Sequence, residues 1–231
     1  MSSDRREAAM QVLERLRSAG VIVTAEGDTL PLHSELPVVE AKLLQRWLRD
    51  QRPARILEVG LAYGVSTLSI LAALEDPPER YDIIDAFQTR DWHGAGLRHL
   101  QEAGIPGGLV FHEELSELCL PRLLAAGARY DFAYIDGWHT FDQVAVEFYF
   151  INRMLAPGGV IVFDDVHMPS LQKVLAQVLS FPAYERLPLP DDFRRSRVAR
   201  VRRAAGVPEY RLAAVRKRAE DRRNWDWFED F

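Results

Sequence analysis

Short apolar runs rich in Val, Ile, Leu and Phe alternate along the chain with longer stretches in which apolar residues recur at helical spacing. The runs predict strands near 55–60, 81–85, 109–112, 131–136 and 158–164. The stretches predict helices near 4–19, 36–48, 65–74, 94–103, 117–126, 140–155 and 169–180. Two further strand candidates lie at 184–189 and 210–216, and residues 21–24 form a short extended piece.

Strands that alternate with helices predict an α/β fold, because each helix returns the chain to a parallel strand of the same sheet. We therefore expect a Rossmann-like, doubly wound, mostly parallel seven-stranded sheet with helices on both faces. Ser34 is expected to cap the helix at 36–48. The turn formed by Pro157, Gly158 and Gly159 is expected to break the helix before the fifth strand.

The first strand ends in a glycine-containing turn that leads directly into a helix. Gly60 and Gly64 let the backbone approach a ligand, and the helix amides beyond them can bind a polar group. A dinucleotide site needs a glycine where this chain has Ala62. Glu58 would repel a pyrophosphate but could hold a cationic amino-acid group. A nucleotide-like cofactor is therefore expected, and a turn without any ligand is the alternative.

The pattern Glu58-x-Gly60-x-x-x-Gly64-x-Ser66 resembles motif I of the class I S-adenosylmethionine-dependent methyltransferases, especially the small O-methyltransferase branch. An acid at the end of the second strand can accept hydrogen bonds from ribose hydroxyls, although it could also be a solvated strand-end acid. A serine after the third strand stands where such enzymes hold adenine, or is only a helix cap. The resemblance implies S-adenosylmethionine as cofactor, held by Glu58, Gly60, Gly64, Ser66, Asp85 and Ser116.

Acidic residues also follow the fourth and fifth predicted strands. Asp136 ends one strand, and Asp164 and Asp165 end the other. Neighbouring parallel strands would bring three carboxylates to one edge, where their mutual repulsion requires a neutralising charge. Mg²⁺ supplies such a charge and binds carboxylate oxygens at about 2.0–2.1 Å. The alternative is that these acids cap strand ends or bind helix amides.

These acids resemble the metal ligands of catechol O-methyltransferase-type enzymes, where the third ligand is commonly Asn and here is Asp165. The position three residues after Asp136 is typically the catalytic Lys of those enzymes. Here it is His139, which is similar to the macrocin and mycinamicin sugar O-methyltransferases. The resemblance covers about residues 53 to 175 and implies that His139 is the base. His139 could instead cap the next helix, and His167 is a second candidate for the base or for a ligand.

Composition narrows the class of protein. The chain has 231 residues, of which 48% are hydrophobic, so it can bury a full core. Cys119 is the single cysteine, which excludes an internal disulfide and favours a reducing compartment. No apolar signal core or membrane-length run is present, so a soluble, cytoplasmic protein is expected.

The net charge of −5 hides a basic segment at 194–223, with twelve Arg or Lys against three acids. It is interpreted as a solvated surface, because aromatic residues are not interleaved with the arginines as a nucleic-acid site would need. No membrane or nucleic-acid partner is therefore expected. The apolar helix at 36–48 indicates a homodimer.

Together, these observations predict an S-adenosylmethionine-dependent O-methyltransferase, assisted by Mg²⁺ or a similar ion. Its acceptor would be a hydroxyl of a small molecule or natural product, with a sugar among the candidates. The alternatives are an N-methyltransferase, a metal-free member of the family, or a non-catalytic binding or scaffold protein. One methyltransferase domain is expected over 1–231, with a helical cap at 1–50, a cofactor-binding core at 53–175 and C-terminal strands with a basic tail at 182–231.

Overall fold

The computed structural model describes residues 2–24, 26–33, 35–104 and 107–231. The chain forms two compact units, Met1–Ser116 and Glu117–Phe231, and each is described by itself. The predicted residue Ser34 lies outside the described residues, and the N-cap position of its helix is taken by Pro37.

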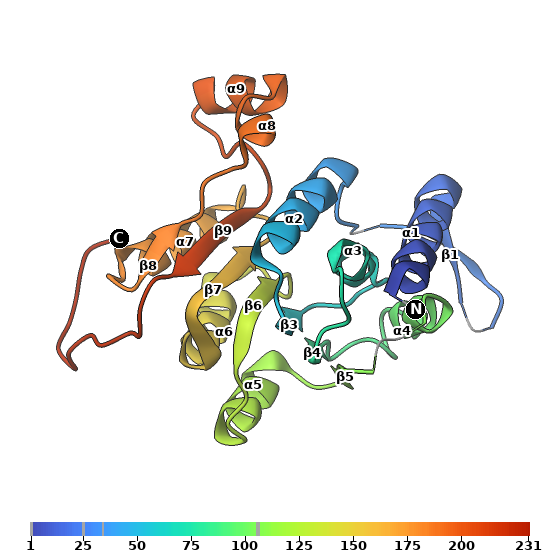
Figure 1. Cartoon of the computed structure of the whole chain (residues 1–231), viewed down its shortest axis with the longest axis horizontal. Helices are drawn as coiled ribbons and strands as arrows, with labels where there is room; N and C mark the ends of the chain where they lie inside the picture. Colours follow the sequence, from blue (N-terminus) through green and yellow to red (C-terminus); the bar gives the residue numbers. More distant parts are fainter. Residues whose placement is uncertain (1, 25, 34, 105–106) are drawn as a thin grey trace. The chain divides into compact units, whose positions relative to one another are not determined.

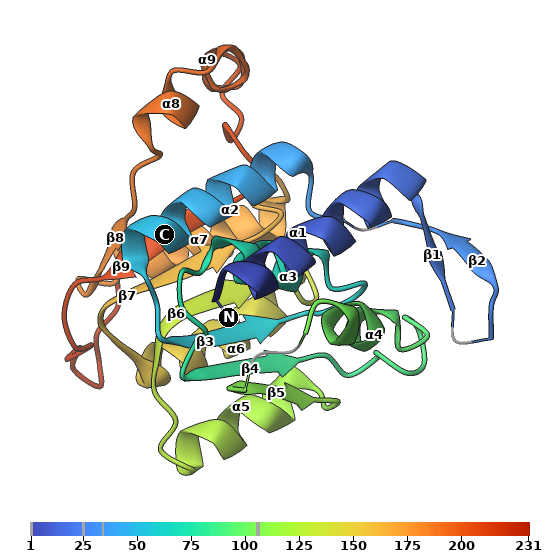
Figure 2. The same ribbon diagram turned by 45° about the vertical axis from the view of Figure 1, so that its right-hand side comes forward.

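The first unit contains three parallel strands in the order β5-β4-β3. Helix α3 follows β3, and α1 and α2 both pack against α3 (Figure 2). A small antiparallel hairpin extends past the end of α1. The elements of this unit are α1 (Ser2–Ala19), β1 (Val21–Val23), β2 (Thr29–Pro31), α2 (Val38–Gln51), β3 (Arg55–Val59), α3 (Val65–Ala73), β4 (Arg80–Ile84), α4 (Ala95–Glu102) and β5 (Leu109–His112).

The second unit has four strands in the order β6-β7-β9-β8. β6 and β7 are parallel, whereas β9 runs antiparallel to both β7 and β8. Two short helices, α8 and α9, lie on the long connection from β8 to β9 and stand away from the strands (Figure 1). The elements are α5 (Ser116–Ala125), which begins at the boundary, β6 (Tyr130–Ile135), α6 (Phe141–Met154), β7 (Leu155–Phe163), α7 (Pro169–Ser180), β8 (Tyr184–Arg186), α8 (Asp191–Arg194), α9 (Arg197–Ala204) and β9 (Ala213–Lys217).

The predicted fold class is confirmed, since seven strands form a mixed, mostly parallel sheet flanked by helices. The strand before the carboxylate pair is longer than expected. It begins at Leu155, directly after α6, and its pairing with β6 is irregular between Tyr130 and Phe132. The glycine at 158, with φ +88°, lies within this irregular stretch. The prediction of a single domain over 1–231 stays a prediction.

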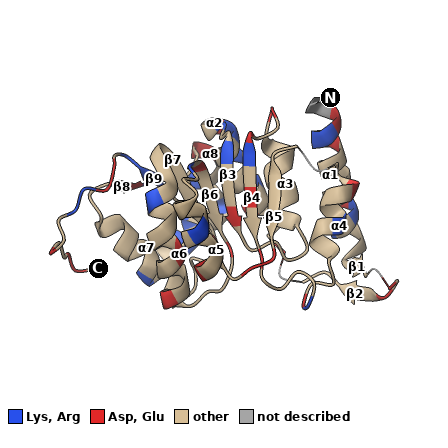
Figure 3. Ribbon diagram, turned by 90° about the horizontal axis from the view of Figure 1, so that it is seen from below, with Lys and Arg blue, Asp and Glu red and all other residues tan. Residues whose placement is uncertain are grey.

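The described residues include no helix that has the length and apolar character of a membrane span. Cys119 is buried, and Arg122 donates to its sulfur at 3.4 Å. Basic residues occur on β9 and on the segment that follows it, as the blue parts of the ribbon in Figure 3 show.

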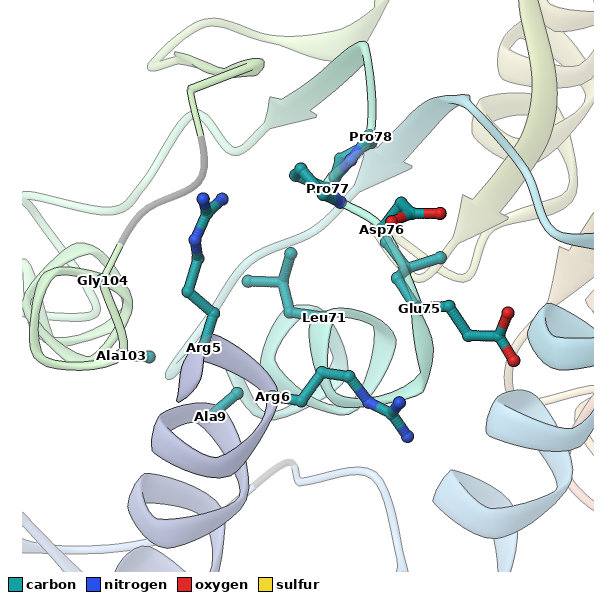
Figure 4. A pocket seen from close by; sticks show the side chains of 11 residues that line it. Arg5, Arg6, Ala9, Leu71, Glu75, Asp76, Pro77, Pro78, Ala103 and Gly104 are labelled. Carbon is teal, nitrogen blue, oxygen red and sulfur yellow. The ribbon is translucent and has the colours of Figure 1, made fainter. Parts of the chain in front are cut away.

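A small hollow in the first unit lies at the carboxyl end of α3 (Figure 4). The glycine turn leads into the opposite, amino end of this helix, so the hollow is not the predicted cofactor site. It is lined by Arg5, Arg6, Ala9, Leu71, Leu74, Glu75, Asp76, Pro77, Pro78, Ala103 and Gly104.

Lys217 on β9 is buried at the end of α6, with only 1% of its surface exposed. Its ammonium group donates to the carbonyls of Asn152 at 2.6 Å and Leu155 at 2.8 Å. The last carbonyls of a helix have no partner within the helix, and a cation there also offsets the negative end of the helix dipole. The side chain of Asn152 extends the network to Asp221 at 2.7 Å. Lys217 therefore ties α6 to β9 and to the segment that follows it.

Replacing Lys217 by Met should lower the free energy of unfolding by about 1–3 kcal/mol, because two buried carbonyls lose their donor. Arg218→Met is the matched control, since the side chain of Arg218 is 62% exposed. Urea denaturation followed by circular dichroism measures both variants. Equal stability of Lys217→Met and Arg218→Met would contradict this role.

Candidate active site

The turn after β3 has the geometry that the sequence predicts. Gly60 and Gly64 have φ values of +96° and +81°, and Ala62 between them has +47°. Positive φ angles favour glycine because a Cβ clashes with the following carbonyl. A Cβ on Gly64 would also lie 3.3 Å from the carbonyl oxygen of Gly96. The chain therefore turns sharply from strand to helix, and the missing Cβ of the buried Gly64 makes room for the backbone of Gly96.

Asp85, at the end of β4, supports this turn directly. Its carboxylate accepts the N–H groups of Leu61 at 3.0 Å and Ala62 at 2.8 Å, and that of Phe87 at 2.9 Å. The side chain of the buried Gln88 donates to the Ala62 carbonyl at 2.9 Å. The acid predicted to bind the ribose thus also fixes the shape of the turn. The sequence analysis did not identify Gln88, since a glutamine in a loop carries no distinctive signal.

Glu58 is fully buried beneath the turn. Its carboxylate accepts hydrogen bonds from the hydroxyls of Ser66 at 2.6 Å and Thr67 at 2.9 Å, and from Tyr81. Burial raises the pKa of Glu58 to about 7, although these hydrogen bonds oppose the shift. The side chains of Glu58 and Ser66 are therefore directed at each other, not at an open surface. Ser116, the other predicted cofactor residue, is buried at the first position of α5.

In the second unit, the three predicted carboxylates lie together at the ends of β6 and β7. The hydroxyl of Tyr134 lies 2.8 Å from Asp164 Oδ2 and 3.3 Å from Asp136 Oδ2. Asp165 has a positive φ of +52°, so the chain bends immediately after Asp164. This bend brings Asp165, the second aspartate of the pair, into the cluster. In a strand that continued without the bend, its side chain would point to the opposite face of the sheet.

Asp165 is the most strongly engaged of the three acids. Arg211 donates two N–H groups to Asp165 Oδ1, the first from Nε at 2.7 Å. His139 Nε2 lies 2.9 Å from Asp165 Oδ2, a charge contact that lacks hydrogen-bond alignment. His139 Nε2 is also 3.7 Å from Asp136 Oδ1, and His167 Nδ1 is 3.5 Å from Asp165 Oδ1. Both predicted histidines therefore contact the cluster, with His139 the closer one.

The pKa values of the three carboxyls shift in two directions: those of Asp136 and Asp164 are raised, and that of Asp165 is lowered. Burial, and then the charge of Asp164, raise the pKa of Asp136 well above its ordinary value. Burial and the charge of Asp165 raise the pKa of Asp164. Burial also acts on Asp165, but His139 and Arg211 outweigh it and lower the pKa of that carboxyl. Asp136 first, and Asp165 second, raise the pKa of His139 to about 10.

The predicted Mg²⁺ site stays a prediction. Within the described part of the chain, no three His, Cys, Asp or Glu side chains are grouped so that they could hold a metal ion. The physical reason is that Asp165 is paired with Arg211 and His139, leaving Asp136 and Asp164 around the Tyr134 hydroxyl. The sequence analysis treated Arg211 only as one member of a basic segment and did not consider Tyr134.

Comparison with known proteins is consistent with this description. Residues 57–166 match a family described as "Methyltransferase domain". A caffeoyl-CoA O-methyltransferase from Populus kitakamiensis is 28% identical over 134 residues, which are 56% of this chain and 54% of that protein. The match thus spans about half the length of this curated relative.

Solved structures show the same fold. An O-methyltransferase from Bacillus cereus, in complex with S-adenosylhomocysteine, has a TM-score of 0.64 and 18% identity, with 91% of each chain covered. The O-methyltransferase TomG from Streptomyces achromogenes, in complex with S-adenosylmethionine, has a TM-score of 0.63 and 18% identity over 91% of this chain and 89% of TomG. Residues 57–166 thus match a methyltransferase-domain family, and the chain has the Rossmann-like fold of solved O-methyltransferases that bind S-adenosylmethionine or S-adenosylhomocysteine.

Proposed function

We propose that this protein methylates a hydroxyl group of a small molecule, with S-adenosylmethionine as the methyl donor. The observation that carries the proposal is His139, which lies beside Asp136 and Asp165 at the ends of the strands. An imidazole held by carboxylates can take a proton from a hydroxyl, and oxygen needs that proton removed more than nitrogen does. The N-methyltransferase alternative therefore ranks second.

The first unit would hold the cofactor. Gly60 and Ala62 are partly exposed in this turn, and Asp85 Oδ1, which accepts the Phe87 N–H, has a second lone pair that could accept a ribose hydroxyl. Ser116, at the start of α5, would contact the adenine through its hydroxyl. We assign Glu58 and Ser66 an indirect role: they keep the turn in shape.

The chemistry needs one proton transfer by the protein. Bound S-adenosylmethionine supplies an activated methyl group, and S-adenosylhomocysteine remains after transfer. His139 takes the acceptor's proton as the oxygen bonds to the methyl carbon. Because Nε2 of His139 faces the carboxylates, Nδ1 is the ring nitrogen that would take the proton. The protein otherwise contributes positioning.

The Mg²⁺ ion predicted from the sequence stays an alternative. Asp136, Asp164 and Asp165 would hold it, and Asp165 would then have to exchange Arg211 for the ion. No step is derived through it. In that alternative, chelation would abolish turnover and leave S-adenosylmethionine bound.

The names of relatives suggest the acceptor class. One relative is a caffeoyl-CoA O-methyltransferase, and TomG is involved in tomaymycin synthesis. Both names support a small-molecule acceptor, and a sugar hydroxyl stays among the candidates.

The homodimer also stays a proposal. Of the apolar residues on α2, only Val38 and Val39 are about half exposed, while the larger ones are buried in this chain.

S-adenosylmethionine should bind and NAD should not, because a dinucleotide turn needs a glycine where this chain has Ala62. Asp85→Asn should weaken S-adenosylmethionine binding by roughly 1–3 kcal/mol, the scale of a charge-assisted hydrogen bond. Asp91→Asn is the control, since this exposed carboxylate pairs with Arg90. Calorimetry measures each affinity. NAD binding without S-adenosylmethionine binding would refute the cofactor assignment.

His139→Ala should reduce turnover by roughly 10²–10⁴, the usual contribution of a general base, while S-adenosylmethionine still binds. Part of the loss should return at high pH, where solvent can take the proton. Turnover is followed as S-adenosylhomocysteine formed with a panel of phenolic and sugar hydroxyl acceptors, caffeoyl-CoA included. His167→Ala is the comparison. If only His167→Ala loses activity, the base is His167.

The pH profile should reflect the raised pKa of His139. A base with a pKa of about 10 is mostly protonated at neutral pH, so its competent neutral form increases as pH rises. The value of kcat/KM should therefore climb about tenfold per pH unit and level only near the pKa. A profile that levels near the ordinary histidine value of roughly 6.5 would show that the carboxylates do not act on His139.

A further inference from the structure

Arg211 lies just before β9, and the pairing of β9 with β7 fixes its position. The strands are antiparallel, with Ala213 opposite Phe163. The same register, continued past the strand ends, places Arg211 opposite Asp165, and the Val166 N–H donates to the Arg211 carbonyl at 2.8 Å. The backbone therefore holds this arginine at the carboxylates, which two flexible surface side chains could not achieve alone.

Both oxygens of Asp165 are engaged by positively charged or ionisable groups. Oδ1 accepts two N–H groups of Arg211, and Oδ2 lies 2.9 Å from His139 Nε2. The Asp165 side chain is only 14% exposed, so water competes weakly for these contacts. Two N–H donors from one planar guanidinium form a strong and directional contact with a carboxylate. A metal ion would have to displace part of this arrangement.

The other two carboxylates also have partners from this chain. Asp164 accepts the Tyr134 hydroxyl at Oδ2 and the Asp165 N–H, at 2.6 Å, at Oδ1. The same Tyr134 hydroxyl is 3.3 Å from Asp136 Oδ2. The cluster thus has a buried hydroxyl between two acids and a guanidinium on the third.

We propose that Arg211 supplies the positive charge that a divalent cation would otherwise bring to these carboxylates, so that proton removal by His139 requires no metal. Arg211 acts through Asp165, which holds the imidazole of His139, and is therefore a positioning residue. The inference rests on the proposed function for its role in catalysis. Its statement about metal binding can be tested without any acceptor.

Mn²⁺ binding to the chelator-treated protein, measured by electron paramagnetic resonance, tests that statement. Wild type should leave the added Mn²⁺ free in solution. Arg211→Met removes the guanidinium that neutralises Asp165. Because the freed carboxylate can then bind a cation, the dissociation constant of this variant for Mn²⁺ should be at least about tenfold lower than that of wild type. Arg211→Lys keeps the charge and should behave like wild type. Arg195→Met, at an arginine that is 74% exposed, is the control and should also behave like wild type.

Wild-type protein that binds one Mn²⁺ at least as tightly as Arg211→Met would overturn the proposal, and this result needs no variant to fold. Thermal denaturation and S-adenosylmethionine binding establish that each variant is folded. In turnover assays, EDTA should leave the rate of wild type within about twofold of its value without EDTA. The rate of Arg211→Met should fall roughly 10²-fold, which is part of the rate enhancement that a correctly positioned general base supplies. Arg211→Lys should recover part of that loss. Failure to bind S-adenosylmethionine would instead contradict the proposed function and leave the Mn²⁺ result standing.

Discussion

Carboxylates placed where strands end must be neutralised, and this requirement shapes both units of the protein. In the first unit the solution is hydrogen bonding. Three hydroxyls surround the buried Glu58, and two turn amides point at Asp85. In the second unit the solution is opposite charge, because Arg211 reaches Asp165. A buried carboxylate without such partners would take up a proton or destabilise the fold, so these contacts decide the local conformation.

The first solution changes how the glycine turn is understood. A motif with an acid, two glycines and a hydroxyl suggests that each side chain contacts the ligand. In the structure, Glu58 and Ser66 hydrogen bond to each other at 2.6 Å and are enclosed by the protein. They help to set the path of the chain, and the positive φ values of Gly60 and Gly64 complete the sharp turn. The motif specifies a backbone shape, and a cofactor would be recognised largely by that shape.

The elements that the sequence could predict are those whose apolar residues fill the core. The strand at Arg55–Val59 and the helix at Pro169–Ser180 were expected almost residue for residue, since burial imposes their periodicity. Helices α8 and α9 were not expected, because they are short and mostly exposed, so no apolar stripe marks them. The contact between Arg211 and Asp165 joins residues 46 positions apart and depends on the register of β9. No local pattern contains that information, so the acids could be predicted to cluster but their partner could not.

The presence of Asp at position 165, where similar enzymes commonly have Asn, follows from the same charge balance. Two carboxylates and an amide around a dication carry no net charge. Here a third carboxylate adds a negative charge, and Arg211 compensates it directly. His139, with its pKa raised to about 10, carries a second positive charge at neutral pH. The remaining negative charge lies on Asp136 and Asp164. Their raised pKa values favour one proton shared between these two carboxyls, beside the Tyr134 hydroxyl. The charges of the cluster therefore cancel with groups of this chain alone. Asp165 and Arg211 depend on each other: an Asn at position 165 would leave the guanidinium of Arg211 without its counter-charge. Loss of Arg211 would in turn restore the need for an external cation.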